Sequence, residues 1–308
     1  MSLETLEIWA SEGLDICKLS PRSWEVSIDY FNSSTDVQRH LPSAQFISWT
    51  KIGKRLTKLS IDVAKSYFLS SPKSMLRIRP RHLDDWANLS SKLYKGTWKS
   101  AKLSSKFFEA TPLLMEYISF EEWAKYAEFL NNLSKRSYDL AIDSLELSIS
   151  LFEKLDNDSG EVINLLLDSS EKSWKDIKMI FETINAYMIE LEAFNRNQIL
   201  NLSRKLLVTG NINPIDTMKK TSSIVSKINN EDKDLFFSMA KSLSTIDPKS
   251  SNDFFDVVPI LLEKINFQQI SSWHSHGIKN SENQNIELIN DFFTLKSKES
   301  REIIDSLS

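Results

Sequence analysis

The stretch FISWTKIGKRLTKLSIDVAKSYF, residues 46–68, combines a tryptophan, a glycine four residues later and an adjacent aromatic pair. These are Trp49, Gly53 and the pair Tyr67-Phe68. Residues four apart lie one turn apart on the same face of an α-helix, so a large indole followed by a small residue forms a ridge beside a hollow. Apolar residues also recur every three or four positions around Trp49, which predicts an amphipathic helix whose hollow receives a neighbouring helix.

The pattern recurs along the chain: a tryptophan with a small residue four positions later occurs five times, and an adjacent aromatic pair also occurs five times. The first four tryptophans are separated by 40, 37 and 37 residues, a repeat length that is typical of helical solenoids. The tryptophans and their small residues are Trp9 with Gly13, Trp49 with Gly53, Trp86 with Ser90, Trp123 with Ala127, and Trp273 with Gly277. The aromatic pairs are Tyr30-Phe31, Tyr67-Phe68, Phe107-Phe108, Phe254-Phe255 and Phe292-Phe293.

This spacing predicts an all-α fold, an α-solenoid of helical repeats of about 37–40 residues. Five prolines follow a side chain that can cap a helix, which predicts that a helix begins at each of them. Each repeat is therefore expected to contain three helices: a short one that begins at proline, a tryptophan helix and an aromatic-pair helix. The five pairs are Ser20-Pro21, Ser71-Pro72, Thr111-Pro112, Asn213-Pro214 and Asp247-Pro248.

The pattern weakens between residues 134 and 235, where residues 134–155 and 161–194 are predicted to form longer helices. The loop DNDSG at residues 156–160 separates them and is the expected boundary. We therefore expect N-terminal repeats in residues 1–155 and C-terminal repeats in residues 161–308, within one continuous solenoid.

Composition excludes several classes of protein. Only 6 Gly and 8 Pro occur among 308 residues, too few for the turns of a β-sandwich or a Rossmann sheet. A single cysteine excludes an internal disulfide framework and suggests a reducing compartment. The N-terminus carries acidic residues where a signal peptide needs basic ones, and no apolar run approaches the length of a membrane span. A cytoplasmic protein is expected.

Catalytic and metal-binding patterns are also missing from the sequence. His274 and His276 lie two residues apart, so on a helix they point away from each other and cannot hold one metal ion from one face. Cys17 has no activating partner nearby and is expected to be a small, buried or half-buried residue. No phosphate-binding loop or nucleophile motif occurs. We expect no enzyme activity, no cofactor and no metal.

Charge is distributed unevenly along the chain. Residues 1–50 contain 3 basic and 7 acidic side chains, whereas residues 51–106 contain 14 basic and 3 acidic ones. Five lysines within this basic segment recur at intervals of 3, 4, 3 and 4 residues, which places them on one helix face if a helix continues through Gly96. These residues are Lys92, Lys95, Lys99, Lys102 and Lys106, and they follow Arg77, Arg79 and Arg81.

This basic segment has several interpretations. It is a solvated outer face, or it binds an acidic protein partner, which includes the acidic part of a second copy. It could instead bind nucleic acid or an anionic membrane surface. Lysine carries a compact charge without the bidentate geometry of arginine, which favours loose electrostatic docking over recognition of base sequence.

The residues from Leu235 to Leu243, followed by Asp247-Pro248, Phe254-Phe255 and Trp273, carry a family resemblance. They resemble the helical repeats that precede the von Willebrand A domain in bacterial proteins of the nitric-oxide-reductase-activation and CoxE type, which are often paired with MoxR-like AAA ATPases. The resemblance implies a helical-repeat arm in an ATPase-assisted system that activates other complexes. The metal motif of a von Willebrand A domain is missing from the sequence, so metal-dependent adhesion is not implied.

Together these observations predict a non-enzymatic scaffold that mediates protein–protein interaction, with an acidic protein or an AAA ATPase as the expected partner. The alternative is a nucleic-acid-binding solenoid that uses the basic segment 51–106.

Overall fold

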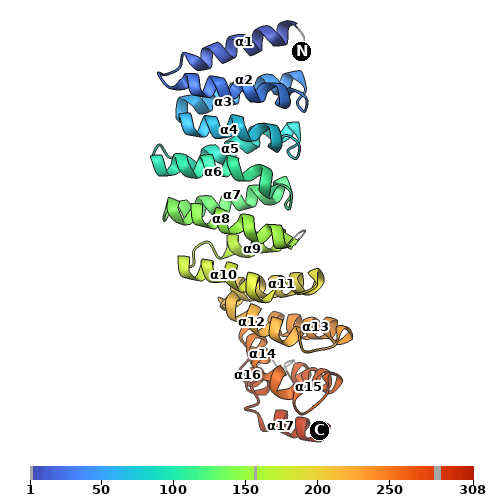
Figure 1. Cartoon of the computed structure of the whole chain (residues 1–308). Coiled ribbons are helices and arrows are strands. Elements are labelled where there is room, and N and C mark those ends of the chain that lie inside the picture. Colours follow the sequence, from blue (N-terminus) through green and yellow to red (C-terminus); the bar gives the residue numbers. More distant parts are fainter. Residues whose placement is uncertain (1–2, 156–157, 281–285) are drawn as a thin grey trace. The chain divides into compact units, whose positions relative to one another are not determined.

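The computed structural model of the chain describes residues 3–155, 158–280 and 286–308. All regular elements in these ranges are helices, which confirms the predicted all-α fold (Figure 1). The chain divides into two compact units, residues 1–163 and 164–308. The first unit contains α1 (Leu3–Cys17), α2 (Ser23–Gln38), α3 (Ser43–Leu59), α4 (Ile61–Ser74), the short 3₁₀ helix η1 (Pro80–His82), α5 (Leu83–Leu93), α6 (Trp98–Leu114), α7 (Phe120–Ser134) and α8 (Tyr138–Leu155).

The division between the units falls within α9 (Ser159–Asp168), near the predicted boundary loop. Residues 156 and 157 of that loop lie outside the described residues, and residues 159 and 160 belong to α9. The second unit contains α10 (Trp174–Tyr187), α11 (Ala193–Gly210), α12 (Pro214–Val225), α13 (Asn230–Ile246), α14 (Pro248–Leu262), α15 (Phe267–Asn280), α16 (Ile286–Phe293) and α17 (Lys298–Leu307).

Helices within each unit are arranged in two layers. In the first unit the odd-numbered helices α1, α3, α5 and α7 contact one another in succession, and so do the even-numbered helices α2, α4, α6 and α8. Each odd-numbered helix also packs against the even-numbered helix that follows it, and the second unit repeats this arrangement from α11 onward. One odd–even pair is therefore one repeat, consistent with a helical-repeat array.

The prediction of three helices per repeat was wrong, because Pro72 and Pro112 lie inside α4 and α6 rather than at helix starts. The hydroxyls expected to cap these helices bond back to their own helix instead. Ser71 Oγ donates to the carbonyl of Tyr67 at 2.6 Å, and Thr111 Oγ1 donates to the carbonyl of Phe107 at 2.8 Å. Each helix ends two residues after its proline, which has no N–H to donate to the preceding turn.

The other proline predictions have mixed outcomes. Asn213 and Asp247 cap α12 and α14 as predicted, and a proline occupies the first helical position of both. Pro21 lies in the turn before α2. The capping box that begins at Ser119 is present at the start of α7, where Ser119 and Glu122 each bond to the other's backbone N–H.

The small residue after each tryptophan makes room for the aromatic pair of the following helix. A Cβ atom on Gly53 would clash with the ring of Phe68, and one on Gly13 would clash with Phe31. In four of the five pairs the second ring lies edge-on to the tryptophan of its own repeat, with centroids 4.9–5.3 Å apart and planes at 79–80°. This geometry occurs for Trp9 with Phe31, Trp49 with Phe68, Trp86 with Phe108, and Trp273 with Phe293.

In four of the five pairs the first ring connects neighbouring repeats. It lies against the tryptophan of the next repeat with centroids 4.4–6.4 Å apart, at interplanar angles of 13–36°. The pairs are Tyr30 with Trp49, Tyr67 with Trp86, Phe107 with Trp123, and Phe254 with Trp273. These last four tryptophans are fully buried, which confirms that they form the core. Trp24 and Trp98, outside the pattern, are exposed.

The repeat continues through the region where the sequence pattern weakens. Ile199, Phe236 and Trp273 follow one another at intervals of 37 residues, and all three are fully buried on odd-numbered helices. Ser203 and Ala240 lie four residues after the first two, in the small-residue position. The predicted helix over 161–194 was wrong, because two turns interrupt that segment at 169–173 and 188–192. Aliphatic residues in the tryptophan position concealed this repeat.

Ion pairs join equivalent positions of neighbouring repeats. Their partners are 36–42 residues apart in sequence, which matches the repeat length. They are Lys54 with Glu12 and Asp15, Lys65 with Glu25, Lys99 with Asp139, Arg204 with Asp168, and Lys220 with Asp256.

Candidate functional site

The predicted lysine row does not lie on one helix. Helix α5 ends at Leu93, and Tyr94 caps it in an extended conformation. Gly96 follows with φ +78°, a left-handed conformation that glycine adopts without strain, and α6 begins at Trp98. The turn therefore divides the row: Lys92 lies on α5, Lys95 lies in the turn and three lysines lie on α6.

Two of the three lysines on α6 lie close to carboxylates. Lys99 forms an ion pair with Asp139 on α8, and the Nζ atom of Lys106 lies 3.5 Å from Glu109. Lys102 is exposed. Their even-numbered layer thus presents both charge signs on this part of the first unit.

The three arginines of the basic segment, Arg77, Arg79 and Arg81, are exposed in the connection between α4 and α5. Lys95 follows the other end of α5. Because an α-helix rises 1.5 Å per residue, the 11 residues of α5 separate the arginine end from the Lys95 end by about 16 Å. The eight predicted residues therefore do not form a single patch.

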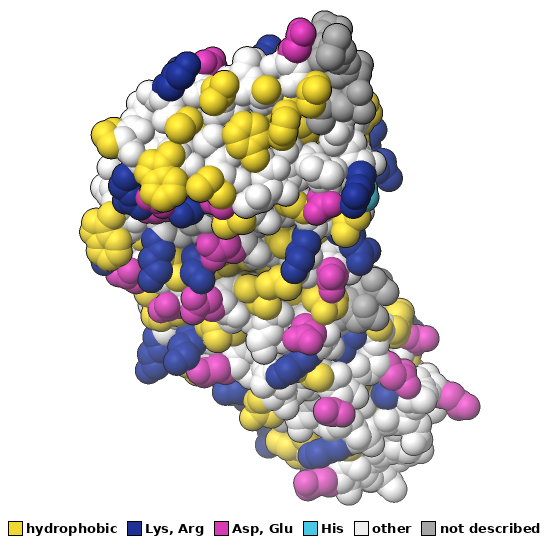
Figure 2. All heavy atoms as spheres, turned by 45° about the horizontal axis from the view of Figure 1, so that its top comes forward, with side chains coloured by type: hydrophobic (Ala, Val, Ile, Leu, Met, Phe, Trp, Pro, Cys, Tyr) yellow, Lys and Arg dark blue, Asp and Glu magenta, His cyan; other side chains and the backbone are white. Residues whose placement is uncertain are grey.

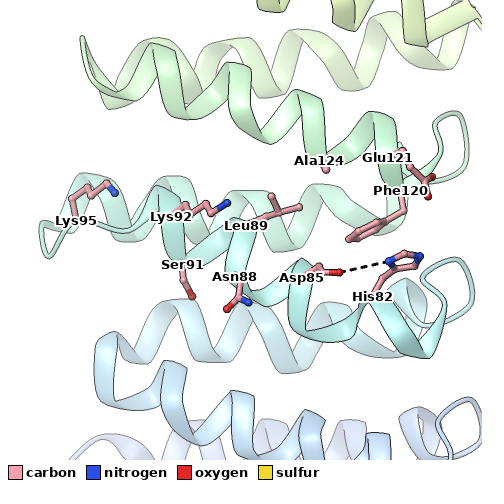
Figure 3. Close-up of a pocket in the computed structure, with 10 residues that line it drawn as sticks. All are labelled: His82, Asp85, Asn88, Leu89, Ser91, Lys92, Lys95, Phe120, Glu121 and Ala124. Atoms are coloured by element: carbon pink, nitrogen blue, oxygen red, sulfur yellow. Dashed lines mark ion pairs between the residues drawn. The ribbon is translucent and has the colours of Figure 1, made fainter.

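Lys92 and Lys95 line a groove between α5 and α7 (Figure 3). Odd-numbered helices of the first unit pack less extensively against one another than even-numbered ones, which leaves space between them. The groove has a volume of about 830 Å³, and a second hollow between the same helices shares Leu89, Lys92 and Ala124 with it. Its lining residues are His82, Asp85, Asn88, Leu89, Ser91, Lys92, Lys95, Phe120, Glu121 and Ala124. We call it the α5–α7 groove.

The two ends of the α5–α7 groove carry opposite charge. Lys92 and Lys95 lie at one end, whereas Asp85 and Glu121 lie toward the other (Figure 3). Leu89 and Ala124 lie between them in the same view. The groove can therefore accept a segment with an acidic group, an apolar middle and a basic group in that order.

An aromatic wall closes the acidic end of the groove. The imidazole of His82 stacks on the ring of Phe120 with centroids 4.5 Å apart and planes at 24°. His82 Nδ1 lies 3.7 Å from Asp85 Oδ2, an ion pair whenever the imidazole is protonated. This wall offers a stacking surface for a guanidinium or an aromatic ring.

Hydrogen bonds to neighbouring helices fix the α5 side of the groove. Arg55 on α3 donates to Asn88 Oδ1 at 3.2 Å, and the Tyr94 hydroxyl donates to the carbonyl of Leu59 at 2.7 Å. The backbone N–H of Lys95 donates to Ser100 Oγ at 3.0 Å, which holds the turn against α6. The groove wall is thus fixed in position before any ligand binds.

The remaining candidate residues lie elsewhere. Cys17 is exposed at the end of α1, so its predicted burial was wrong. His274 is buried between the rings of Phe254 and Phe293, and its Nε2 atom lies 3.2 Å from the carbonyl oxygen of Met239. Burial lowers the pKa of His274 to about 4. Among the described residues no group of three or more His, Cys, Asp or Glu side chains could hold a metal ion.

Sequence reasoning identified Lys92 and Lys95 but not the acidic and aromatic half of the groove. His82, Phe120 and Ala124 come from two helices, and only their packing brings them together. No helix in the described part of the chain has both the length and the apolar character needed to cross a bilayer. No family model, curated protein or solved structure matches the chain.

Proposed function

We propose that the protein is a non-enzymatic scaffold that binds other proteins, and that the α5–α7 groove receives a peptide segment of one such partner. The observation that carries this proposal is the groove's arrangement of charge: a basic end at Lys92 and Lys95, an apolar centre at Leu89, and an acidic end at Asp85. A helical-repeat surface suits this role because stacked repeats present extended faces to partners.

The arrangement favours a peptide over nucleic acid. A phosphate backbone is uniformly negative and is bound by surfaces that are positive along their length. The α5–α7 groove includes Asp85 and Glu121, and the lysines of α6 lie beside Asp139 and Glu109. A chain of phosphates along either surface would meet carboxylates, whereas a peptide can alternate its charges.

The dimensions indicate the length of the bound segment. Asp85 and Lys95 are ten residues apart along α5 and the turn after it, or about 15 Å at the helical rise. An extended peptide covers this distance with about five residues. The ligand is therefore a short segment with Asp or Glu at one end, Leu, Ile or Val in the middle and Arg or Lys at the other end.

A selection from a displayed peptide library on the full chain tests this proposal. We expect recovered peptides to have the acidic–apolar–basic order. The double variant Lys92→Glu/Lys95→Glu should weaken their binding at least tenfold, measured by fluorescence anisotropy. A peptide whose acidic residue is replaced by lysine should bind that variant better than it binds the original chain.

The matched control is Lys99→Glu/Lys102→Glu, which reverses the same number of charges on α6, outside the groove. It should change peptide affinity less than twofold. Equal loss in both double variants contradicts the groove as the binding site. Tight binding of single- or double-stranded oligonucleotides with a steep decrease on adding salt contradicts the proposal itself. An AAA ATPase, the partner implied by the family resemblance, can be tested on the same variants.

A further inference from the structure

The first repeat exposes an apolar face on α2. Trp24, Ile28 and Phe31 are spaced four and three residues apart, so they lie on one side of the helix. Trp24 is 52% exposed and Ile28 is 50% exposed. Large apolar side chains this open to solvent on one face mark an interaction surface more often than isolated ones do.

The repeat register identifies what this face is. The positions of Trp24, Ile28 and Phe31 correspond in α6 to Ala101, Ser105 and Phe108, all buried. They are covered there by the preceding repeat: Phe108 packs edge-on against Tyr67, with ring centroids 5.3 Å apart. Within the described residues of the first unit, no repeat precedes α1 and α2. The face on α2 therefore corresponds to a surface that packs against the preceding repeat in α6, and here it is exposed.

Helix α1 extends the same face. Leu6 is 44% exposed and Leu14 is 57% exposed, whereas Phe46, which occupies the position of Leu6 one repeat later, is 1% exposed. Figure 2, which turns the N-terminal end toward the viewer, shows hydrophobic side chains gathered there. We call Leu6, Ala10, Leu14, Trp24, Ile28 and Phe31 the N-terminal face.

We propose that the N-terminal face binds the N-terminal face of a second copy of the chain, forming a dimer with twofold symmetry. This inference is independent of the α5–α7 groove. Head-to-tail stacking would instead place the N-terminal face against α17, the last helix. That helix exposes Lys298, Glu299, Arg301, Glu302 and Asp305, so its surface is polar rather than apolar. A second N-terminal face offers a matching apolar surface.

Two oppositely charged residues beside the N-terminal face are placed as a twofold-symmetric dimer would require. Glu7 near the start of α1 and Lys18 just after its end are both exposed. Two α1 helices packed antiparallel across the axis bring Glu7 of each copy toward Lys18 of the other. Opposite charges at such an edge favour correct orientation and association more than they add affinity.

The size of the face predicts a weak dimer. Helices of 15 and 16 residues are about 22–24 Å long, and two of them side by side cover roughly 450 Å² in projection. Two copies then bury about 900 Å² by this measure, below the ~1,200–2,000 Å² of standard stable interfaces. Dimerisation should consequently depend on concentration in the micromolar range.

Sedimentation equilibrium of the full chain over a hundredfold range of concentration tests the proposal. We expect the mass to rise from one chain to two. Trp24→Glu should keep the protein monomeric over the same range, because it replaces a large exposed apolar side chain of the interface by a charge. Trp98→Glu is the matched control: Trp98 is 72% exposed, on α6, and this variant should dimerise like the original chain.

Alkylation of Cys17, the single cysteine, locates the contact. Cys17 occupies the position of Thr57 one repeat later, which is 6% exposed, so a partner on the N-terminal face should cover it. We expect alkylation to slow severalfold at the concentration where the dimer forms, and not to slow in Trp24→Glu. A mass that stays at one chain, a mass that grows beyond two chains, or a dimer that Trp24→Glu leaves intact overturns the proposal.

Discussion

The repeat formed by α3 and α4 and the repeat formed by α11 and α12 achieve the same packing with different side chains. The first places Trp49 beside Gly53, and the second places Ile199 beside Ser203; all four residues are buried. The next repeat begins 37 residues later in both cases. What the array requires is therefore a large residue beside a small one at this spacing, rather than a tryptophan.

Polar bonding distinguishes the two repeats. In the aromatic repeat the Trp49 indole N–H donates to Ser71 Oγ at 2.9 Å, and the Tyr67 hydroxyl donates to the carbonyl of Trp49 at 3.2 Å. In the aliphatic repeat the Thr221 hydroxyl donates to Thr217, within its own helix. Directional bonds thus link α3 to α4, in addition to the complementary volumes that both repeats use.

The largest expected effect comes from filling the hollow of the aromatic repeat. Gly53→Ala should lower the free energy of unfolding by about 2–3 kcal/mol, because the new Cβ overlaps the fully buried ring of Phe68 and this overpacking exceeds the gain in helix propensity. Chemical denaturation followed by circular dichroism measures this change.

The aliphatic repeat supplies the control. Ser203→Ala should change stability by less than about 0.5 kcal/mol, because the buried Ser203 hydroxyl has no hydrogen-bond partner among the described residues. Combining Gly53→Ala with Phe68→Leu should recover much of the loss, since Ala127 and Leu145 occupy these two positions in the fourth repeat. If the stability losses of Gly53→Ala and Phe68→Leu simply add in the double variant, the proposed fit between the residues at positions 53 and 68 is contradicted.

The second effect concerns a titratable residue among the rings of the second unit. The pKa of His274 lies at about 4, below its usual 6.5, so the folded chain binds fewer protons than the unfolded chain between these values. Stability is therefore full above pH 6.5 and is lost as the pH falls toward 4. From pH 7 to pH 5 the His274 contribution should fall by about 2 kcal/mol.

Chemical denaturation of the original chain and of a His274 variant at pH 7 and pH 5 measures the His274 contribution as the difference between their pH dependences. His274→Gln should show a pH dependence smaller by that amount, because glutamine keeps a donor for the carbonyl of Met239 but does not titrate. His40→Gln, at an exposed histidine after α2, should retain the original pH dependence. Parallel curves for His274→Gln and the original chain would contradict the assignment.

A smaller effect separates the polar bonding of the two repeats. Ser71→Ala leaves the buried Trp49 N–H without its acceptor and should cost about 1–2 kcal/mol. Thr221→Val, which removes a hydroxyl that bonds only within its helix, should cost less than about 0.5 kcal/mol. If Ser71→Ala and Thr221→Val lower stability equally in thermal unfolding, the Ser71 and Thr221 hydroxyls contribute equally and the proposed difference between the repeats is contradicted.

The smallest effect is expected from the ion pairs between repeats. Lys220 and Asp256 are 2.7 Å apart, but their side chains are 29% and 56% exposed. Asp256→Asn should therefore change the free energy of unfolding by less than about 0.5 kcal/mol, and added salt should reduce the difference. If Asp256→Asn lowers the free energy of unfolding by more than about 1 kcal/mol, the expectation that solvent screens this ion pair is contradicted.

Much of the fold could be predicted because the repeat is recorded in local spacing. Trp49, Gly53 and Phe68 identify helix faces by their separations, and the structure confirms that they meet. The proline prediction failed at Pro72 because a proline that follows a serine can occur at a helix start or in the last turn of a longer helix. Only the hydrogen-bond partners of the Ser71 hydroxyl distinguish the two cases. The repeat at Ile199 was missed because aliphatic residues give no distinctive signal.

The candidate site was predictable only in part. Lys92 and Lys95 stood out by charge and spacing, but Ala124 and Phe120 carry no signal of their own and reach the groove through the packing of α7 beside α5. The sequence also could not show that Gly96 adopts a φ of +78°, which separates the lysines of α5 from those of α6.

The sequence by itself determined that this chain is a stack of helix pairs, because a period of 3.6 residues within helices and a spacing near 37 residues between them are local properties of the chain. Tertiary structure decided which charges share a surface and which apolar face lacks a neighbour. Both depend on which elements lie opposite each other in space: Trp24 and Ala101 occupy corresponding helix positions, but Trp24 is exposed and Ala101 is buried.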